Sequence, residues 1–158
     1  MAEYRGNTDY DGRSRFAIVV SAYNQAVTGR LLQGAVDRLR EADVPDERID
    51  VVWAPGAWEL PLLVDRLARQ SRYASIIALG CVIRGETTHD RHINRQVSLA
   101  LGELALRYQL PIPFGLLTCQ NMEQALQRAG GTAGNKGAEC AEVALQLVDL
   151  LGRLPDEA

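Results

Sequence analysis

The stretch Ser75-Ile-Ile-Ala-Leu-Gly-Cys-Val-Ile-Arg-Gly-Glu-Thr-Thr-His89 decides the fold of this chain. Its first half is an apolar run that opens with β-branched residues, Ile76 to Leu79, and that Gly80 closes. A short run of this kind is typical of a strand that is buried on both faces, as in a parallel sheet. The second half, Arg84 to His89, is polar and ends where a helical pattern begins. The stretch therefore predicts a strand, a turn and the start of a helix.

The polar half of this stretch also predicts a ligand site. In open α/β sheets, ligands bind where strands end and helices begin. Gly85 lets the backbone approach a ligand closely, and the N–H groups at a helix start favour an anion. His89 adds an imidazole, the side chain that gains and loses protons most readily near neutral pH. Together these features indicate catalysis on a phosphorylated small molecule, although a Thr-Thr-His helix start is more often only a cap.

Strand and helix patterns alternate along the rest of the chain, and this predicts an α/β fold. We expect three layers, with helices on both faces of a central four-stranded parallel sheet. Right-handed crossovers would bring four turns to one edge of the sheet. The other expected strands are 16–20, 49–53 and 110–118. The expected helices are 28–42 with Thr28 as its cap, 62–68, 89–109, 122–129 and a last one ending near Leu154. The four turns contain Tyr23-Asn24, Gly56–Glu59, Gly85–His89 and Leu117-Thr118.

Composition predicts one globular domain, 15–158, after a polar arm without periodicity, 1–14. The chain has 158 residues and a net charge of −3, which argues against a surface for nucleic acid or for an anionic membrane. No apolar run approaches the roughly 20 residues that span a bilayer. The N-terminus carries no apolar export segment, so we expect a cytoplasmic location.

No metal or cofactor is expected. The three cysteines are odd in number and far apart, so neither a disulfide framework nor a zinc site is indicated. The two histidines, His89 and His92, have no cysteine or carboxylate near them at a spacing that fits a metal site. The chain has no Walker A motif and no Gly-x-Gly-x-x-Gly after its first strand, which disfavours nucleotide hydrolysis and dinucleotide binding.

Five separated blocks of the chain resemble the lumazine synthase family, which makes 6,7-dimethyl-8-ribityllumazine in riboflavin biosynthesis. They follow one another in order and with matching spacing over roughly residues 15–150. The resemblance implies a flavodoxin-like fold and the condensation of 5-amino-6-(D-ribitylamino)uracil with 3,4-dihydroxy-2-butanone 4-phosphate, which releases phosphate and water without a cofactor or metal. The blocks are Phe16 to Asn24, Pro55 to Pro61, Ala78 to His89, Phe114 to Thr118, and Glu123 to Gly130 with Gly134 to Gly137.

The resemblance also implies which residues hold the ribitylaminouracil. Tyr23 matches the aromatic residue that stacks on the pyrimidine, a role its ring could fill, although a surface-packed tyrosine is equally common. Glu59 matches the acceptor of ribityl hydroxyls, although the helix dipole alone favours a carboxylate there. The full set is Tyr23, Asn24, Ala57, Trp58 and Glu59, with the backbone of Cys81, Val82 and Ile83 at the pyrimidine edge.

A second implied set handles the phosphorylated ketone. Glu86 and Thr87 match the phosphate loop, and His89 matches the proton-transfer residue. Phe114 and Arg128 match residues that a neighbouring subunit donates, Arg128 to the phosphate, with Lys136 near it. Without the resemblance, Arg128 and Lys136 would equally well complement helix dipoles.

The resemblance implies a homopentamer, and in some members twelve pentamers form an icosahedral shell. The short link Gly130–Gly137 is similar to that of the shell-forming members, and the arm 1–14 would add to a neighbour's sheet. Riboflavin synthase is a further candidate partner. One departure stands at Asp90-Arg91-His92, where the family usually has an aromatic and then an acidic residue.

Two other hypotheses stay open from the sequence. One is a flavin- or lumazine-binding or shell-forming protein without turnover, although such a protein would not need the phosphate-binding Arg128 and Lys136. The other is a different enzyme of phosphorylated sugars on a similar sheet. Failure to bind the ribitylaminouracil would favour the latter.

Overall fold

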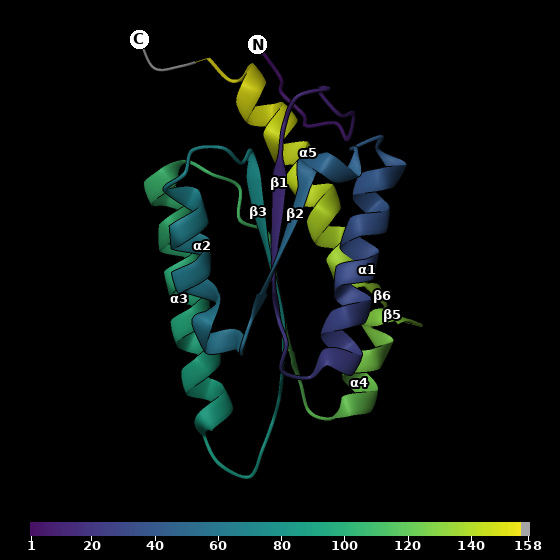
Figure 1. Ribbon diagram of the computed structural model, residues 1–158, viewed down its shortest axis with the longest axis vertical. Coiled ribbons are helices and arrows are strands. Elements are labelled where there is room, and N and C mark those ends of the chain that lie inside the picture. The colour runs from purple at the N-terminus through teal and green to yellow at the C-terminus, as the bar shows by residue number, and fades with distance from the viewer. Residues whose placement is uncertain (156–158) are drawn as a thin grey trace.

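The computed structural model describes residues 1–155 and confirms the predicted α/β architecture. Its centre is a parallel sheet of four strands in the order β2-β1-β3-β4. The helices α2 and α3 cover one face, and α1 and α5 cover the other (Figure 1). The strands are β1 (Phe16–Ser21), β2 (Ile49–Ala54), β3 (Ser75–Ile83) and β4 (Phe114–Cys119), and the helices are α1 (Gln25–Glu41), α2 (Leu60–Ala68), α3 (His89–Tyr108), α4 (Met122–Gln127) and α5 (Lys136–Arg153).

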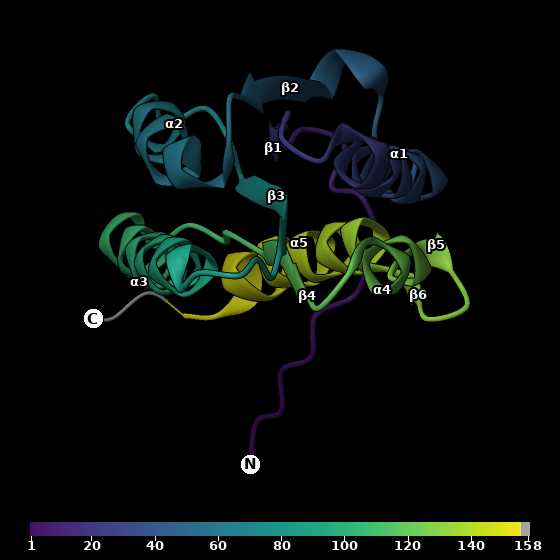
Figure 2. The ribbon, with the colours of Figure 1, turned by 90° about the horizontal axis from the view of Figure 1, so that it is seen from below.

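Short elements complete the chain. The 3-10 turns are η1 (Asp46–Arg48) before β2 and η2 (Ala57–Glu59) before α2. A small antiparallel pair, β5 (Ala129–Gly131) and β6 (Gly134–Asn135), replaces the simple break that the glycines predict between α4 and α5. Seen from below, the sheet runs between the two helical layers (Figure 2).

The core lies in two layers because alternate residues of the sheet point to opposite faces. In β1, Phe16 and Ile18 pack into the layer under α1 and α5, whereas Ala17 and Val19 pack into the layer under α2 and α3. All six residues of β1 and eight of the nine in β3 are buried. This double-sided burial explains why both strands are continuous apolar runs rather than alternating ones.

The strand β3 does not end at Gly80, as the sequence suggests. It continues to Ile83, and Gly80 pairs with Leu116 of β4. A Cβ at Gly80 would lie 2.7 Å from the Leu116 side chain. The glycine therefore serves close packing in the middle of the strand, and the turn comes after Ile83.

The predicted cap of the first long helix is also wrong. The helix α1 begins at Gln25, and Thr28 is fully buried inside its first turn. The N-cap is Asn24, which adopts the left-handed conformation at φ 60°. Asparagine tolerates this conformation better than most residues, so the chain turns directly from β1 into α1.

The arm 1–14 contains no helix or strand. The Asn7 backbone N–H donates to the Asp149 carboxylate at 2.9 Å, and Tyr10 packs against the core layer under α5. The addition of this arm to a neighbour's sheet stays a prediction. Among the residues that the structure describes, no helix is long and apolar enough to cross a membrane.

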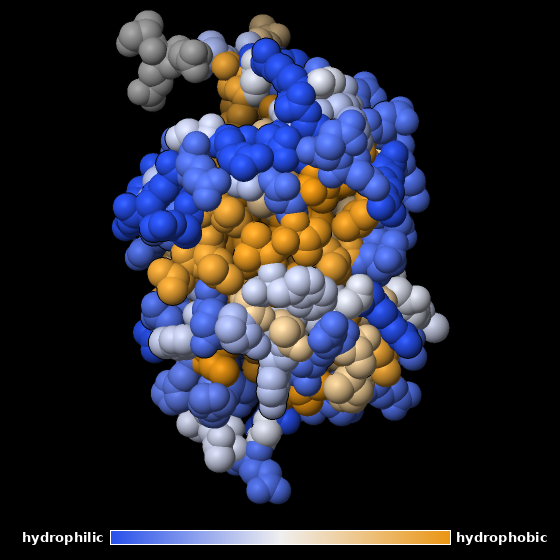
Figure 3. Space-filling view, viewed as in Figure 1, coloured by the Kyte–Doolittle hydropathy of each residue, from blue (hydrophilic) through white to orange (hydrophobic). Residues whose placement is uncertain are grey.

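The strand β2 forms an edge of the sheet and leaves apolar side chains exposed. Val51 is 40% exposed and Trp53 is 43% exposed. An apolar area extends across this face of the molecule (Figure 3). Such patches are typical of surfaces that contact another protein.

Candidate active site

A cavity of about 460 Å³ opens at the carboxyl edge of the sheet. The segments that follow β1, β2 and β3 form its walls, together with the first turn of α3. This is the edge at which ligands bind in open α/β sheets. The lining residues are Tyr23, Asn24, Gly56, Ala57, Trp58, Glu59, Cys81, Val82, Ile83, Gly85, Thr87, His89, Asp90 and Ile93.

The turn after β1 presents Tyr23 and holds Asn24. The Ser21 hydroxyl accepts a hydrogen bond from the Tyr23 backbone N–H at 3.2 Å. The Asn24 side-chain amide donates to the Cys81 carbonyl of β3 at 3.0 Å. Tyr23 itself is 70% exposed, so its ring is free to cover a flat ligand.

The turn after β2 presents Trp58 and Glu59. Ala57 is buried and anchors the turn, whereas Trp58 is 55% exposed at the cavity wall. A Cβ at Gly56 would lie 3.0 Å from Glu59 Oε2, so the glycine makes room for this carboxylate. Glu59 also occupies the N-cap position of α2, where the helix dipole favours a negative charge.

The end of β3 contributes backbone and a neutral thiol. Cys81 and Val82 are buried, and Ile83 is half-buried in the cavity wall. Burial raises the pKa of Cys81 to about 11, with the nearby Cys119 adding to the effect. The thiol therefore stays protonated near neutral pH and is a poor nucleophile.

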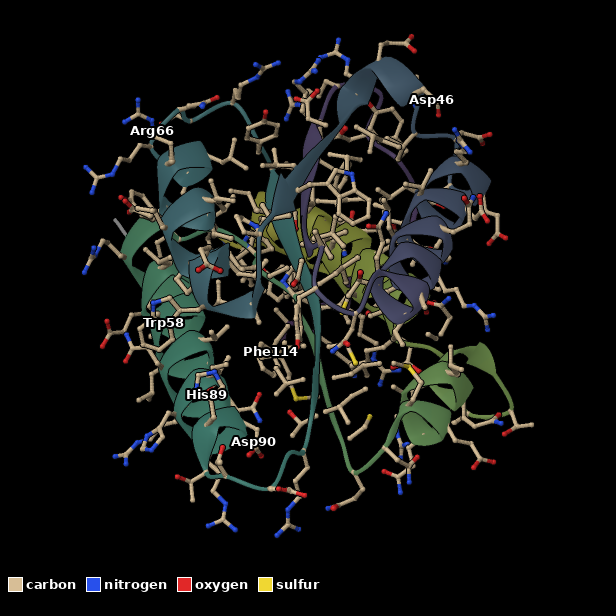
Figure 4. All side chains as sticks on the ribbon, turned by 60° about the horizontal axis from the view of Figure 1, so that its bottom comes forward. Asp46, Trp58, Arg66, His89, Asp90 and Phe114 are labelled. Carbon is tan, nitrogen blue, oxygen red and sulfur yellow. The ribbon has the colours of Figure 1, made fainter. Side chains whose placement is uncertain are left out.

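The loop between β3 and α3 leads to His89. The Thr87 hydroxyl accepts a hydrogen bond from the His89 backbone N–H at 3.3 Å. The N-cap residue itself is Thr88, and its side chain makes no capping hydrogen bond. Thr87 and His89 line the cavity, whereas Glu86 is exposed outside it. Trp58, His89 and Asp90 lie at the same end of the molecule (Figure 4).

Four of the predicted site residues do not line this cavity, namely Glu86 and three residues from later in the chain. Phe114 is 44% exposed at the start of β4. Arg128 and Lys136 line a second cavity, of about 370 Å³, together with Leu117 and Thr118. There Arg128 donates to the Gln124 carbonyl at 3.2 Å, and Lys136 pairs with Glu139 at 3.3 Å.

Only three of the four predicted turns therefore meet in one cavity. Leu117 and Thr118 are not turn residues, because β4 continues to Cys119. The strand β4 also forms the far edge of the sheet, beyond β3. Its residues Leu116 to Thr118 face a cavity of their own.

The structure adds Asp90 and Ile93 to the cavity wall. The sequence singled out Asp90 only as a departure from a motif, and Ile93 only as a core residue of a helix. The three-residue spacing between Asp90 and Ile93 could have identified the pair, since residues three apart share a helix face. No group of three or more His, Cys, Asp and Glu suited to a metal ion occurs within residues 1–155.

The fold and the cavity define a class, namely a three-layer α/β protein with a small-molecule site at the carboxyl edge of a parallel sheet. The family described as 6,7-dimethyl-8-ribityllumazine synthase matches residues 13–152. A Coxiella burnetii (strain Dugway 5J108-111) protein named 6,7-dimethyl-8-ribityllumazine synthase is 50% identical over 137 residues, which cover 87% of this chain and 91% of that relative. The chain therefore belongs to the 6,7-dimethyl-8-ribityllumazine synthase family.

Proposed function

We propose that this protein is a transferase of riboflavin biosynthesis that synthesises 6,7-dimethyl-8-ribityllumazine. It condenses 5-amino-6-(D-ribitylamino)uracil with 3,4-dihydroxy-2-butanone 4-phosphate and releases phosphate and water. The observation that carries the proposal is the family match over residues 13–152, which spans every residue of the cavity.

The cavity suits the ribitylaminouracil. Tyr23 is exposed beside it and stacks on the pyrimidine, while the backbone at Cys81 to Ile83 reads the pyrimidine edge. Glu59, held over Gly56, accepts hydrogen bonds from the ribityl hydroxyls. Ala57 and Trp58 support this chain from the same turn.

His89 moves protons during the reaction. The amine attacks the ketone, water leaves to give an imine, phosphate leaves, and the ring closes. Several of these steps transfer protons near neutral pH, where imidazole serves as acid and base. Alignment of the two reactants supplies much of the remaining rate, since it can remove about 7–11 kcal/mol of a barrier.

The phosphate site combines two subunits. Glu86 and Thr87 form the phosphate loop of one subunit, and Phe114, Arg128 and Lys136 come from its neighbour. Their placement outside the cavity of their own chain supports this reading. An arginine gives charge-assisted hydrogen bonds to phosphate and stabilises it as a leaving group.

The protein is a homo-oligomer under this proposal, built of pentamers. The exposed edge of β2 offers a place for the arm 1–14 of a neighbour. The short Gly130–Gly137 link, folded as β5 and β6, favours twelve pentamers in a shell. An association with riboflavin synthase and a cytoplasmic location stay predictions.

A direct assay tests the proposed reaction. Purified protein is mixed with both substrates, and lumazine absorbance and fluorescence are followed above the uncatalysed background, together with released phosphate. We expect turnover proportional to protein, with one phosphate released per lumazine. Folded, oligomeric protein that binds riboflavin but forms no product would replace this proposal by the non-catalytic alternative.

A further inference from the structure

Asp90 occupies a position that the rest of α3 gives to apolar side chains. Ile93, Val97 and Leu101 recur at steps of four and pack into the core layer under α2 and α3. Asp90 lies three residues before Ile93, so it shares their helix face one turn nearer the helix start, and both residues line the cavity. Its side chain is half-buried, whereas the neighbouring His89 is exposed.

The Asp90 carboxylate has no partner in the described chain. Within residues 1–155, no hydrogen bond or ion pair joins it to another group. Two other half-buried carboxylates have partners, since Asp50 accepts from the Tyr73 hydroxyl at 2.7 Å and Asp65 from the Tyr108 hydroxyl at 2.7 Å. The half-buried Glu59, which lines the same cavity as Asp90, has no such partner among the described residues. The Asp90 oxygens are not among the side-chain atoms that are buried without a partner, so the carboxylate keeps contact with water. Its charge therefore faces any ligand that enters the cavity.

Asp90 also makes this end of the cavity negative. Glu59 is a second carboxylate in the wall, and the Cys81 thiol is neutral near pH 7. Within the described residues, no lysine or arginine lines the cavity. The cations Arg128 and Lys136 lie in the wall of the second cavity.

We propose that Asp90 is a specificity-determining residue, an inference that rests on the proposed function. Its carboxylate repels phosphate from the cavity wall at Asp90 and Ile93, so the phosphate of the ketone stays at the Glu86–Thr87 loop and the carbonyl group lies toward His89. The same charge favours the attack of the amine. When the nitrogen lone pair forms the bond to the ketone carbon, the C=O π pair moves to oxygen and the nitrogen becomes positive. The carboxylate stabilises that positive charge.

The test compares Asp90→Asn with two controls in the assembled enzyme. Asp90→Glu keeps the charge, and Glu103→Gln removes one charge from an exposed position of the same helix. Inorganic phosphate is titrated calorimetrically at low and high salt, and kcat and KM for the phosphorylated ketone are measured. Subunit assembly is checked first, since asparagine has nearly the shape of aspartate.

We expect phosphate to bind Asp90→Asn about three- to tenfold more tightly than wild type at low salt, because one nearby like charge is gone. The difference should shrink at high salt, which a purely structural effect would not produce. The value of kcat should fall severalfold in Asp90→Asn, while Glu103→Gln stays near wild type. Asp90→Glu, which keeps the charge, should not bind phosphate more tightly than wild type. Phosphate affinity within about twofold of wild type, or weaker, would overturn the proposal.

The two proposals fail in distinguishable ways. A wild-type protein that makes no lumazine would refute the proposed function. The phosphate titration would still decide the role of Asp90. Tighter binding in Asp90→Asn alone would support its charge effect, and equal binding in all variants would refute it.

Discussion

The imidazole of His89 stands at the first residue of α3, where the Thr87 hydroxyl fixes its backbone and the cavity lies in front of it. We predict that His89→Ala lowers kcat about a hundredfold, the order of magnitude of general acid–base catalysis. Binding of the ribitylaminouracil should change little, because Tyr23 and Glu59 remain. Steady-state kinetics and a binding titration check both parts. An unchanged kcat would remove His89 from proton transfer.

Buried thiols give a second prediction at the scale of single residues. Burial raises the pKa of Cys81 and of Cys140 to about 11, against 9.0 for an unburied thiol. Between these values, the unfolded chain binds fewer protons than the folded one. The free energy of unfolding should therefore fall as the pH rises from about 9 to about 11.

Urea melts across this pH range measure the effect. Cys140→Ala removes one of the two thiols, so its stability should depend less steeply on pH than that of the wild type. An identical slope in the two proteins would show that the Cys140 thiol does not contribute. Below about pH 8 both thiols are protonated in either state, and no slope from them is expected.

At the scale of elements, the contact between α1 and α5 is set by a glycine. A Cβ at Gly137 would lie 1.9 Å from the Leu31 carbonyl oxygen, which is backbone and cannot swing away. We predict that Gly137→Ala lowers the free energy of unfolding by about 1–3 kcal/mol, the usual cost of overpacking.

Gly152 is the matched control, since it lies in the same helix with nothing within 4 Å of its would-be Cβ. Gly152→Ala should be neutral or raise the free energy of unfolding by up to about 1 kcal/mol, because alanine favours helix. Urea denaturation of the two variants side by side separates the packing effect from helix propensity. Equal stabilities would contradict the close contact.

Most elements could be predicted from the sequence because their patterns are local. Apolar runs and helical periodicity located the four strands and the long helices within a few residues. The errors at Gly80 and Thr28 arose from tertiary contacts, namely the approach of Leu116 and the turn at Asn24. Neither contact can be predicted from the residues that are close in sequence.

The site residues that directly follow a strand end could be predicted from the sequence. Tyr23, Glu59 and His89 share a cavity because three neighbouring strands end at one edge of the sheet. Asp90 was not predicted as a wall residue. Its spacing from Ile93 places it on the apolar face of the helix, but the sequence does not show that this face reaches the cavity. The resemblance already implied that Arg128 serves a neighbour's site, whereas its place in the wall of a second cavity beside β4 required the structure.

At the scale of the whole molecule, the account depends on a site shared between subunits. Arg128 and Lys136 lie outside the cavity that holds His89 in the same chain. We predict that Arg128→Ala raises KM for the phosphorylated ketone about tenfold or more, through the loss of charge-assisted hydrogen bonds to phosphate. The KM for the ribitylaminouracil should change little. Measurement of both constants tests the assignment, and an unchanged KM for the ketone would contradict it.

The most direct measurement mixes the two impaired variants. His89→Ala and Arg128→Ala subunits are denatured together, refolded in equal amounts, and assayed for lumazine at a ketone concentration well below the wild-type KM. If each site takes His89 from one subunit and Arg128 from its neighbour, random assembly leaves about a quarter of the sites intact. We predict about a quarter of wild-type activity, well above the mean of the two variants refolded separately. Activity no higher than that mean would contradict a lumazine-forming site built from two chains.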